Sequence, residues 1–259
     1  MQAVPLGRSG TGASAGNGSG PDLTCDHGVV TDDPTPARSP LELLGALAKT
    51  DAEISEQSRL VEIYTMEGLL QIWWWGKPGA KDVVIMCGGA MGGVTGPGRA
   101  LYVELAASMA AEGRAAMVVD YRKAGDLSRS LLDTCAAVDL AMRNGAERFV
   151  MLGHSFGGAV AVQAAGTFPH LVAGVLTYAT QSAGCEEAAR MGDTPLLLLH
   201  GEHDSILGPE NSVMVHALAG HGEVRTFPKA DHLMSEVADE IAEITGEWVR
   251  TRFDEHARR

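Results

Sequence analysis

The stretch RFVMLGHSFGGAVAVQAA, residues 148–165, decides the fold. A short apolar run ends at Leu152, and a glycine-rich turn leads into small and apolar residues that suit a helix. The turn has the pattern Gly-x-Ser-x-Gly, with Ser155 between Gly153 and Gly157. In a strand–turn–helix context this pattern exposes the serine hydroxyl at a helix N-terminus, where a developing oxyanion is stabilised. Taken alone, the motif fits a nucleophilic serine and a helix N-cap about equally well.

Short apolar runs alternate with helical patterns on both sides of this motif. The runs that we interpret as strands are DVVIMC (82–87), AAMVVDY (115–121), RFVMLG (148–153), VAGVLTY (172–178), PLLLLHG (195–201) and EVRTFP (223–228). The helical patterns cover residues 99–112, 127–143, 155–167, 209–219 and 235–253. This alternation is typical of an α/β fold, in which a mostly parallel sheet is covered by helices on both faces.

An antiparallel hairpin is expected before the first of these strands. Residues 59–65 and 69–76 read as two strands joined at Glu67-Gly68, which brings the sheet to about eight strands. Trp73 and Trp75 should point to one face and Trp74 to the other, where packing explains them better than a ligand cage does. Ahead of the hairpin, ordered structure should begin near Ser39, with Pro40 and Glu42 completing a helix-capping pattern.

Composition divides the chain into a tail and one domain. Residues 1–40 are rich in Gly, Ser, Pro and Asp and have no apolar period, so we predict a disordered tail followed by a single α/β domain over residues 41–259. The tail lacks the apolar core of a secretory signal, and no run is long enough to span a bilayer.

Charge and cysteine content limit the classes of partner and the cellular location that we expect. The net charge of −13 disfavours nucleic acid as a partner. Four unpaired cysteines, Cys25, Cys87, Cys135 and Cys185, indicate reduced thiols and a cytoplasmic location. We therefore expect a small-molecule partner, with neither nucleic acid nor membrane, and the sequence leaves the oligomeric state open.

The loops that follow the strands carry the groups that a serine nucleophile needs. In parallel sheets the site lies beyond the carboxyl ends of the strands. His232, in the loop after the last strand, is the best-placed base for Ser155, whereas His154 sits beside the serine on the wrong side of the turn. Asp204, after the preceding strand, is the best candidate to orient that base, ahead of Glu202 and Asp231. The order Ser155, Asp204, His232 is the one expected for a catalytic triad on this architecture.

An oxyanion hole is expected from two backbone N–H groups. Phe156, the residue after the nucleophile, supplies one of them. Gly89 or Ala90, in the loop GGAMGGVTGPG after the strand at 82–87, supplies the other. This loop has neither of the glycine patterns that bind phosphates in nucleotide sites, so we reject a phosphate-binding role.

With these motifs, the chain resembles the α/β-hydrolase superfamily over about residues 58–253. The resemblance rests on GHSFGG, HGEHD, ADH and the glycine-rich loop, and it is strongest to compact hydrolases similar to dienelactone hydrolase and to prolyl- and acylaminoacyl-peptidase catalytic domains. Two departures stand out: Cys87-Gly88 replaces the usual His-Gly of the oxyanion loop, and Ser155 replaces the cysteine of the dienelactone type. The serine also argues against the aspartate-dependent epoxide hydrolases and dehalogenases.

The resemblance implies a serine hydrolase that cleaves a carboxylic ester or thioester without a metal or cofactor. Many members carry a helical lid, but only sixteen residues separate Tyr178 from Pro195 here, so little or no lid and a small acyl substrate are expected. Met91, Tyr121 and Gln181 are the expected pocket walls. A peptidase or acyltransferase with the same triad remains an alternative, as does a fold relative that binds a ligand or performs elimination or lyase chemistry.

Overall fold

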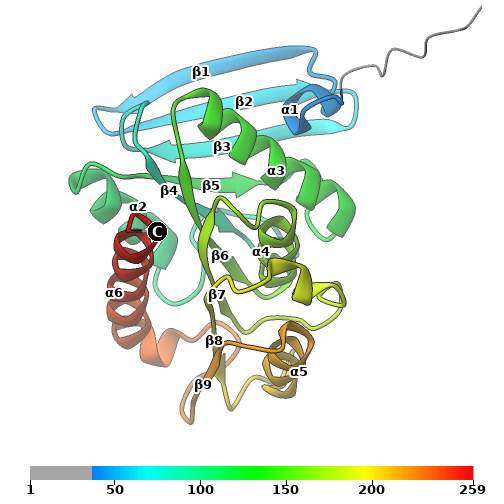
Figure 1. The fold of residues 1–259 in the computed structure, drawn as a ribbon, viewed down its shortest axis with the longest axis vertical. Helices are drawn as coiled ribbons and strands as arrows, with labels where there is room; N and C mark the ends of the chain where they lie inside the picture. The colour runs from blue at the N-terminus through cyan, green and yellow to red at the C-terminus, as the bar shows by residue number, and fades with distance from the viewer. Residues whose placement is uncertain (1–36, 259) are drawn as a thin grey trace, which may run out of the picture. The chain divides into compact units, whose positions relative to one another are not determined.

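The computed structural model describes residues 37–258 and contains one nine-stranded sheet (Figure 1). The strands are β1 (Ala48–Ser55), β2 (Ser58–Thr65), β3 (Gly68–Trp75), β4 (Asp82–Cys87), β5 (Ala115–Asp120), β6 (Arg148–His154), β7 (Val172–Tyr178), β8 (Leu196–Gly201) and β9 (Glu223–Phe227). The helices are α1 (Pro40–Leu43), α2 (Leu101–Ala111), α3 (Leu127–Arg143), α4 (Phe156–Thr167), α5 (Glu210–Ala219) and α6 (Ala238–His256). Most of the predicted tail, including Cys25, lies outside the described residues, and the division at residue 40 stays a prediction.

The order of the strands is β1-β2-β3-β5-β4-β6-β7-β8-β9. Strands β1 to β3 are antiparallel and β3 also pairs antiparallel with β5, whereas β5, β4 and β6 to β9 are parallel to one another. The chain moves outward from β4 in one direction to β5 and in the other to β6. The loops after β4 and β6 therefore start side by side but lead to helices on opposite faces, which is where open α/β sheets form a binding crevice.

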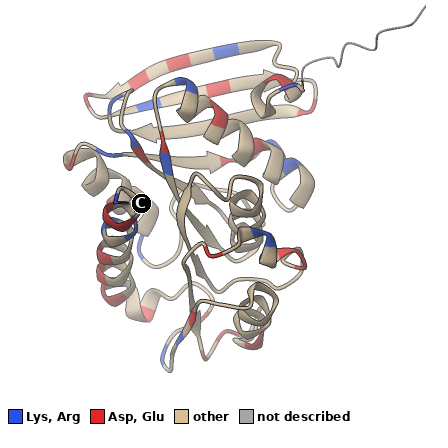
Figure 2. Cartoon of the chain, viewed as in Figure 1, with Lys and Arg blue, Asp and Glu red and all other residues tan. Residues whose placement is uncertain are grey.

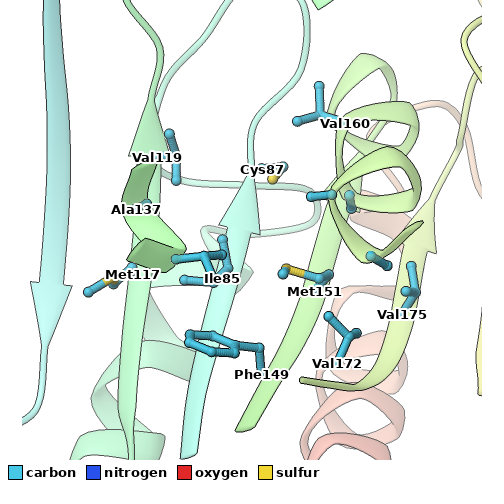
Figure 3. Packing of buried hydrophobic residues seen from close by; sticks show 14 of the residues in the cluster. Ile85, Cys87, Met117, Val119, Ala137, Phe149, Met151, Val160, Val172 and Val175 are labelled. Atoms are coloured by element: carbon cyan, nitrogen blue, oxygen red, sulfur yellow. The ribbon is translucent and has the colours of Figure 1, made fainter. Parts of the chain in front are cut away.

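Two hydrophobic cores cover the two faces of the sheet. Alternate strand residues such as Ile85, Met117 and Met151 pack against α1, α3, α4 and α5, and Figure 3 shows part of this core. The intervening residues, such as Met86 and Leu152, pack against α2 and α6 on the other face. The predicted α/β architecture with helices on both faces is confirmed.

The tryptophan-rich strand β3 takes part in both cores. Trp74 is buried on the α3 side with the Arg59 guanidinium 3.9 Å from its ring centroid. Trp73 and Trp75 stack on the opposite side, with their ring centroids 6.5 Å apart, and pack against the core of α2 and α6. The expected split of the three rings between the faces is therefore confirmed, and packing accounts for them.

Two elements differ from the sequence-based expectation, and a third has the expected start. The edge strand β1 was missed because every residue of AKTDAEIS is exposed, which leaves no apolar alternation to reveal it. Helix α1 has the expected capping box of Ser39 and Glu42 but ends after a single turn. The closing helix begins at Ala238, because residues Ser235–Val237 form a separate 3-10 turn.

The surface carries an excess of acidic side chains. Figure 2 shows acidic residues along α6 and on the strands around β1, with fewer basic residues between them. Within residues 37–258, no helix combines the length and the apolar character that a bilayer crossing requires.

One ion pair in this fold is fully buried, and it joins the end of β5 to α3. Arg122 donates from its backbone N–H and from Nε to the Asp133 carboxylate, at 2.9 and 2.6 Å, and both side chains are almost completely inaccessible to solvent. We expect Asp133→Ala to lower the free energy of unfolding by about 3 kcal/mol, because the buried guanidinium then keeps only the half-exposed Glu67, 3.4 Å from its Nη1, as a partner.

Urea denaturation measures this effect, and Asp51→Ala is the matched control. Asp51 pairs with Arg59 at 3.1 Å on the exposed strand β1, so its loss should cost at most about 1 kcal/mol. Equal losses of unfolding free energy in the two variants would contradict a stabilising role for the buried carboxylate of Asp133.

Candidate active site

The candidate nucleophile sits on a strained turn between β6 and α4. Ser155 has φ 58° and ψ −120°, a backbone conformation that side-chain-bearing residues rarely adopt. Its N–H donates to the carbonyl of Tyr178 at 2.8 Å, and its own carbonyl accepts from Gln181 N–H at 3.3 Å. These bonds tie the turn to the end of β7 and hold Ser155 at the carboxyl edge of the sheet.

Glycines at both ends of the motif make this turn possible. A Cβ on Gly153 would overlap the carbonyl oxygen of Gly157. A Cβ on Gly157 would overlap the carbonyl oxygens of Cys87 and Gly88, at the end of β4. Helix α4 can therefore approach the β4 loop only because no side chain stands at either position.

The β4 loop is held from behind by two tyrosines. Tyr102 donates its hydroxyl to the carbonyl of Cys87 at 3.1 Å, and Tyr121 donates to the carbonyl of Gly88 at 3.4 Å. The Tyr121 ring also packs edge-on against Phe156, with centroids 6.1 Å apart. Tyr121 thus supports the loop from the buried side.

The predicted oxyanion donors lie around Ser155. Phe156 is the first residue of α4, so its N–H belongs to the free amino end of the helix. Gly89 faces the serine, since a Cβ added to Gly89 would lie 3.9 Å from Ser155 Cβ. Gly89 and Ala90 both line the cavity that contains Ser155, so either amide remains a candidate for the second donor.

The predicted acid and base are in direct contact. His232 Nδ1 donates to Asp204 Oδ2 at 2.7 Å, which leaves Nε2 as the free nitrogen of the ring. Asp204 Oδ1 accepts the N–H groups of Ile206 and Leu207, both at 2.8 Å. Burial raises the pKa of the Asp204 carboxyl, but the Leu207, His232 and Ile206 donors outweigh it, so the pKa lies below its usual value. Asp204 is therefore a carboxylate at neutral pH.

The other two acids that competed for this role are engaged elsewhere. Glu202 accepts the hydroxyl of Thr226 at 2.7 Å. Asp231 accepts the backbone N–H groups of Leu233 and Met234, at 2.8 and 3.0 Å, and so shapes the loop that carries the histidine. Of the three candidate acids, Asp204 is the one that contacts His232.

Two further histidines support this pair. His154 donates from Nε2 to the backbone carbonyl of His232 at 2.9 Å, and the two rings lie 5.0 Å apart. His200 is fully buried, and its Nε2 faces the carbonyl of Leu207 at 2.8 Å and Asp204 Oδ2 at 3.2 Å. Because the Leu207 carbonyl is an acceptor, Nε2 carries the proton and donates it there, and the His200 ring packs beside Asp204. The sequence places His200 four residues before Asp204, but that spacing alone did not reveal the contact.

Ser155 and His232 line the same cavity, which has a volume of about 380 Å³. Its walls come from the β4 loop, the Ser155 turn, and the loops after β8 and β9. Among the contacts of residues 37–258, none is a hydrogen bond between the Ser155 hydroxyl and His232. Such bonds often form only once substrate is bound.

The three predicted pocket walls take different positions. Met91 lines the cavity and is almost fully exposed. Tyr121 is buried beneath the β4 loop and does not line it. Gln181 is also absent from the lining, because its side-chain amide turns away to the carbonyl of Ala183 at 2.8 Å. Ile206 and Leu233 line the cavity and were not anticipated, since nothing in their sequence context marks them.

The part of the chain that the structure describes contains no cluster of three or more His, Cys, Asp or Glu side chains arranged to hold a metal ion.

Comparison with protein families identifies the relatives of this site. The family model described as the dienelactone hydrolase family matches residues 83–244, which include Ser155, Asp204 and His232. The chain belongs to the dienelactone hydrolase family. It is accordingly a member of a hydrolase family with the α/β-hydrolase fold, as the sequence motifs indicated. No curated protein matches the chain.

Solved structures agree on the fold. The chain is similar to Est1E from Butyrivibrio proteoclasticus, with 16% identity and a TM-score of 0.65 over 75% of this chain and 99% of that one. It is similar to dienelactone hydrolase from Anabaena variabilis, with 19% identity and a TM-score of 0.63 over 75% and 97% of the two chains. Alpha/beta hydrolase domain-containing protein 10 from mouse has 16% identity and a TM-score of 0.56 over 80% and 99%.

The buried imidazole beside Ser155 makes stability depend on pH. Burial lowers the pKa of His154 from 6.5 to about 4. Between these two pKa values His154 is protonated in the unfolded chain but neutral in the folded chain. The folded state therefore loses stability as the pH falls through this range. We expect the free energy of unfolding to fall by about 2 kcal/mol more between pH 7 and pH 5 in the wild type than in His154→Gln.

Urea denaturation at the two pH values measures this difference. Glutamine keeps a side-chain N–H for the carbonyl of His232 but does not titrate, so the two proteins differ in the ionisable group. An identical pH dependence in both proteins would show that His154 is protonated as easily in the folded as in the unfolded chain.

Proposed function

We propose that this protein is a serine hydrolase that cleaves a carboxylic ester or thioester of a small acyl substrate through an acyl-enzyme intermediate. What supports the proposal most is one constellation: Ser155 on a strained turn shares a cavity with His232, whose Nδ1 is bonded to the Asp204 carboxylate. Membership of a hydrolase family agrees with it. Structures named as an esterase domain and as a dienelactone hydrolase share the fold.

In the proposed reaction, His232 Nε2 removes the proton of the Ser155 hydroxyl while the serine oxygen attacks the acyl carbon. Asp204 holds the ring so that Nδ1 carries its proton and Nε2 is free, and it stabilises the imidazolium that forms. The N–H groups of Phe156 and of Gly89 or Ala90 are the proposed donors to the tetrahedral oxyanion.

The acyl-enzyme is then opened by water. His232 first gives its proton to the leaving alcohol or thiol, and it next removes a proton from the attacking water. Collapse of the second tetrahedral intermediate releases the acid and returns the proton to Ser155. Every step uses groups of this chain and water, and none calls for a metal or an organic cofactor.

The surroundings of the cavity favour a small molecule as the partner. The segment between β7 and β8 contains one 3-10 turn, Ala188–Met191, so little material is available there to cover the cavity. The acidic surface disfavours a nucleic acid. Cys87, Cys135 and Cys185 are buried free thiols, which supports the proposed cytoplasmic location.

The nucleophile can be tested with a fluorophosphonate probe, which forms a covalent adduct with activated serines. We expect the wild-type protein to be labelled and Ser155→Ala to remain unlabelled, because the adduct forms on the Ser155 oxygen. Asp204→Asn should be labelled at least about a hundredfold more slowly, since the His232 ring then loses its orienting carboxylate.

Ser182→Ala is the matched control and should be labelled like the wild type. Ser182 also follows a strand end, but its hydroxyl donates to Asn211 at 2.8 Å. Failure of the folded wild-type protein to react would exclude the acyl-enzyme mechanism and favour a ligand-binding or lyase relative.

The expected acyl size can be tested with p-nitrophenyl esters of increasing chain length. We expect kcat/KM to reach its highest value with acyl chains that fit the cavity and to gain nothing from longer ones, because the additional methylenes stay in water and bury no further apolar surface. Initial rates by absorbance measure the series, and matched acyl thioesters and peptides distinguish an esterase from a thioesterase or peptidase. A maximum at long chains would contradict the small-acyl proposal.

A further inference from the structure

The cavity beside Ser155 is free of formal charge. Of the thirteen residues that line it, none is Asp, Glu, Lys or Arg. The two titratable side chains are His154 and His232, and burial keeps His154 neutral by lowering its pKa to about 4. Glycines, Ala90, Thr95 and apolar side chains make up the remaining wall. A charged substrate group that entered this cavity would lose water without gaining an ionic partner there.

Apolar side chains from three separate loops stand at the margin of the cavity. Met91 from the β4 loop is 97% exposed, Ile206 from the β8 loop is 70% exposed, and Leu233 from the β9 loop is 51% exposed. Large apolar side chains that are exposed together around a cavity mark a surface that covers an apolar partner. We refer to Met91, Ile206 and Leu233 as the apolar rim.

The cations of the surrounding loops, among them Arg99 and Lys229, stand outside the cavity lining. In the loop after β5, which adjoins the β4 loop, Arg122 is bonded to Asp133 and Lys123 lies 3.9 Å from Asp126. The charged group that contacts the β4 loop itself is an acid, since Asp120 Oδ1 accepts the N–H of Gly93 at 3.2 Å. The lining of the cavity therefore gives an anion no ionic partner.

We propose that the site selects neutral, apolar acyl groups and discriminates against acyl groups that carry a carboxylate. The acyl chain occupies the uncharged cavity, and the apolar rim covers its outer end. This inference rests on the proposed function, because it assigns the cavity to the acyl group that Ser155 receives.

A pair of isosteric substrates tests the proposal. The p-nitrophenyl ester of 5-methylhexanoic acid and the mono-p-nitrophenyl ester of glutaric acid have acyl groups of the same shape, but the second ends in a carboxylate. We expect kcat/KM for the neutral ester to exceed that for the anionic ester by on the order of a hundredfold at neutral pH, after subtraction of spontaneous hydrolysis. A ratio below about threefold, or a preference for the anionic ester, would overturn the proposal.

Rim variants show whether the discrimination originates at the cavity. Met91→Lys and Ile206→Lys supply a cation there, so each should raise the relative kcat/KM of the anionic ester by roughly fivefold, the size of a partly exposed ion pair. Met66→Lys is the matched control, because Met66 is 85% exposed in the turn between β2 and β3 and should leave the ratio unchanged. Equal changes in all three variants would assign the preference to overall charge and overturn the proposal.

Salt provides a second check on the origin of the preference. Repulsion by the net charge of −13 is screened when the Debye length falls to about 3 Å in 1 M NaCl, whereas the loss of hydration inside the cavity is not. The proposal requires the ratio to persist in 1 M NaCl, and its collapse would overturn it.

The substrate inference and the proposed function fail in different ways. In one outcome, the probe labels Ser155 and p-nitrophenyl acetate is cleaved, but neither isosteric ester is cleaved. The proposed function then stands, and the substrate inference is overturned. If Ser155 is not labelled and no ester is cleaved, both are overturned.

Discussion

The contact between α4 and the end of β4 is the constraint on which the site depends. Gly157 lies so close to the carbonyls of Cys87 and Gly88 that even a methyl group would overlap them. This approach sets the distance between the Ser155 turn and the β4 loop, whose amides are the proposed oxyanion donors. The hydroxyls of Tyr102 and Tyr121 bond to the same two carbonyls. One close backbone contact therefore positions both the proposed nucleophile and the proposed oxyanion donors of the β4 loop.

The Asp204–His232 pair depends on hydrogen-bond donors that converge on the Asp204 carboxylate. Asp204 accepts bonds from two backbone N–H groups and from the His232 ring, and the buried His200 ring packs beside it. A carboxylate with this many donors stays ionised despite its burial, and its orientation is fixed. His154 holds the backbone of His232, so the ring is supported from its main chain as well as from its side chain. These contacts give the imidazole one tautomer and one direction.

The sequence reveals those parts of the fold and site that follow from local patterns. Continuous apolar runs identified the central strands, and the Gly-x-Ser-x-Gly turn pointed to Ser155 because its glycines are needed for a close backbone approach. Strand β1 stayed hidden because its residues are exposed on both faces and carry no apolar period. Tyr121 was expected on the pocket wall because it follows a strand, but the side-chain direction that buries it depends on packing against Phe156. His200 was missed because its partner Leu207 lies in a loop whose path the sequence does not specify.

Because the apolar rim is exposed, its residues can change the substrate preference without changing the fold. Met91, Ile206 and Leu233 belong to loops at the carboxyl ends of strands, and more than half of each side chain is in contact with solvent. Substitutions at such positions change stability little, whereas changes at Gly157 or in the two cores disturb the whole domain. A lineage with this architecture can therefore exchange one acyl preference for another through a few surface substitutions, while its catalytic framework stays intact.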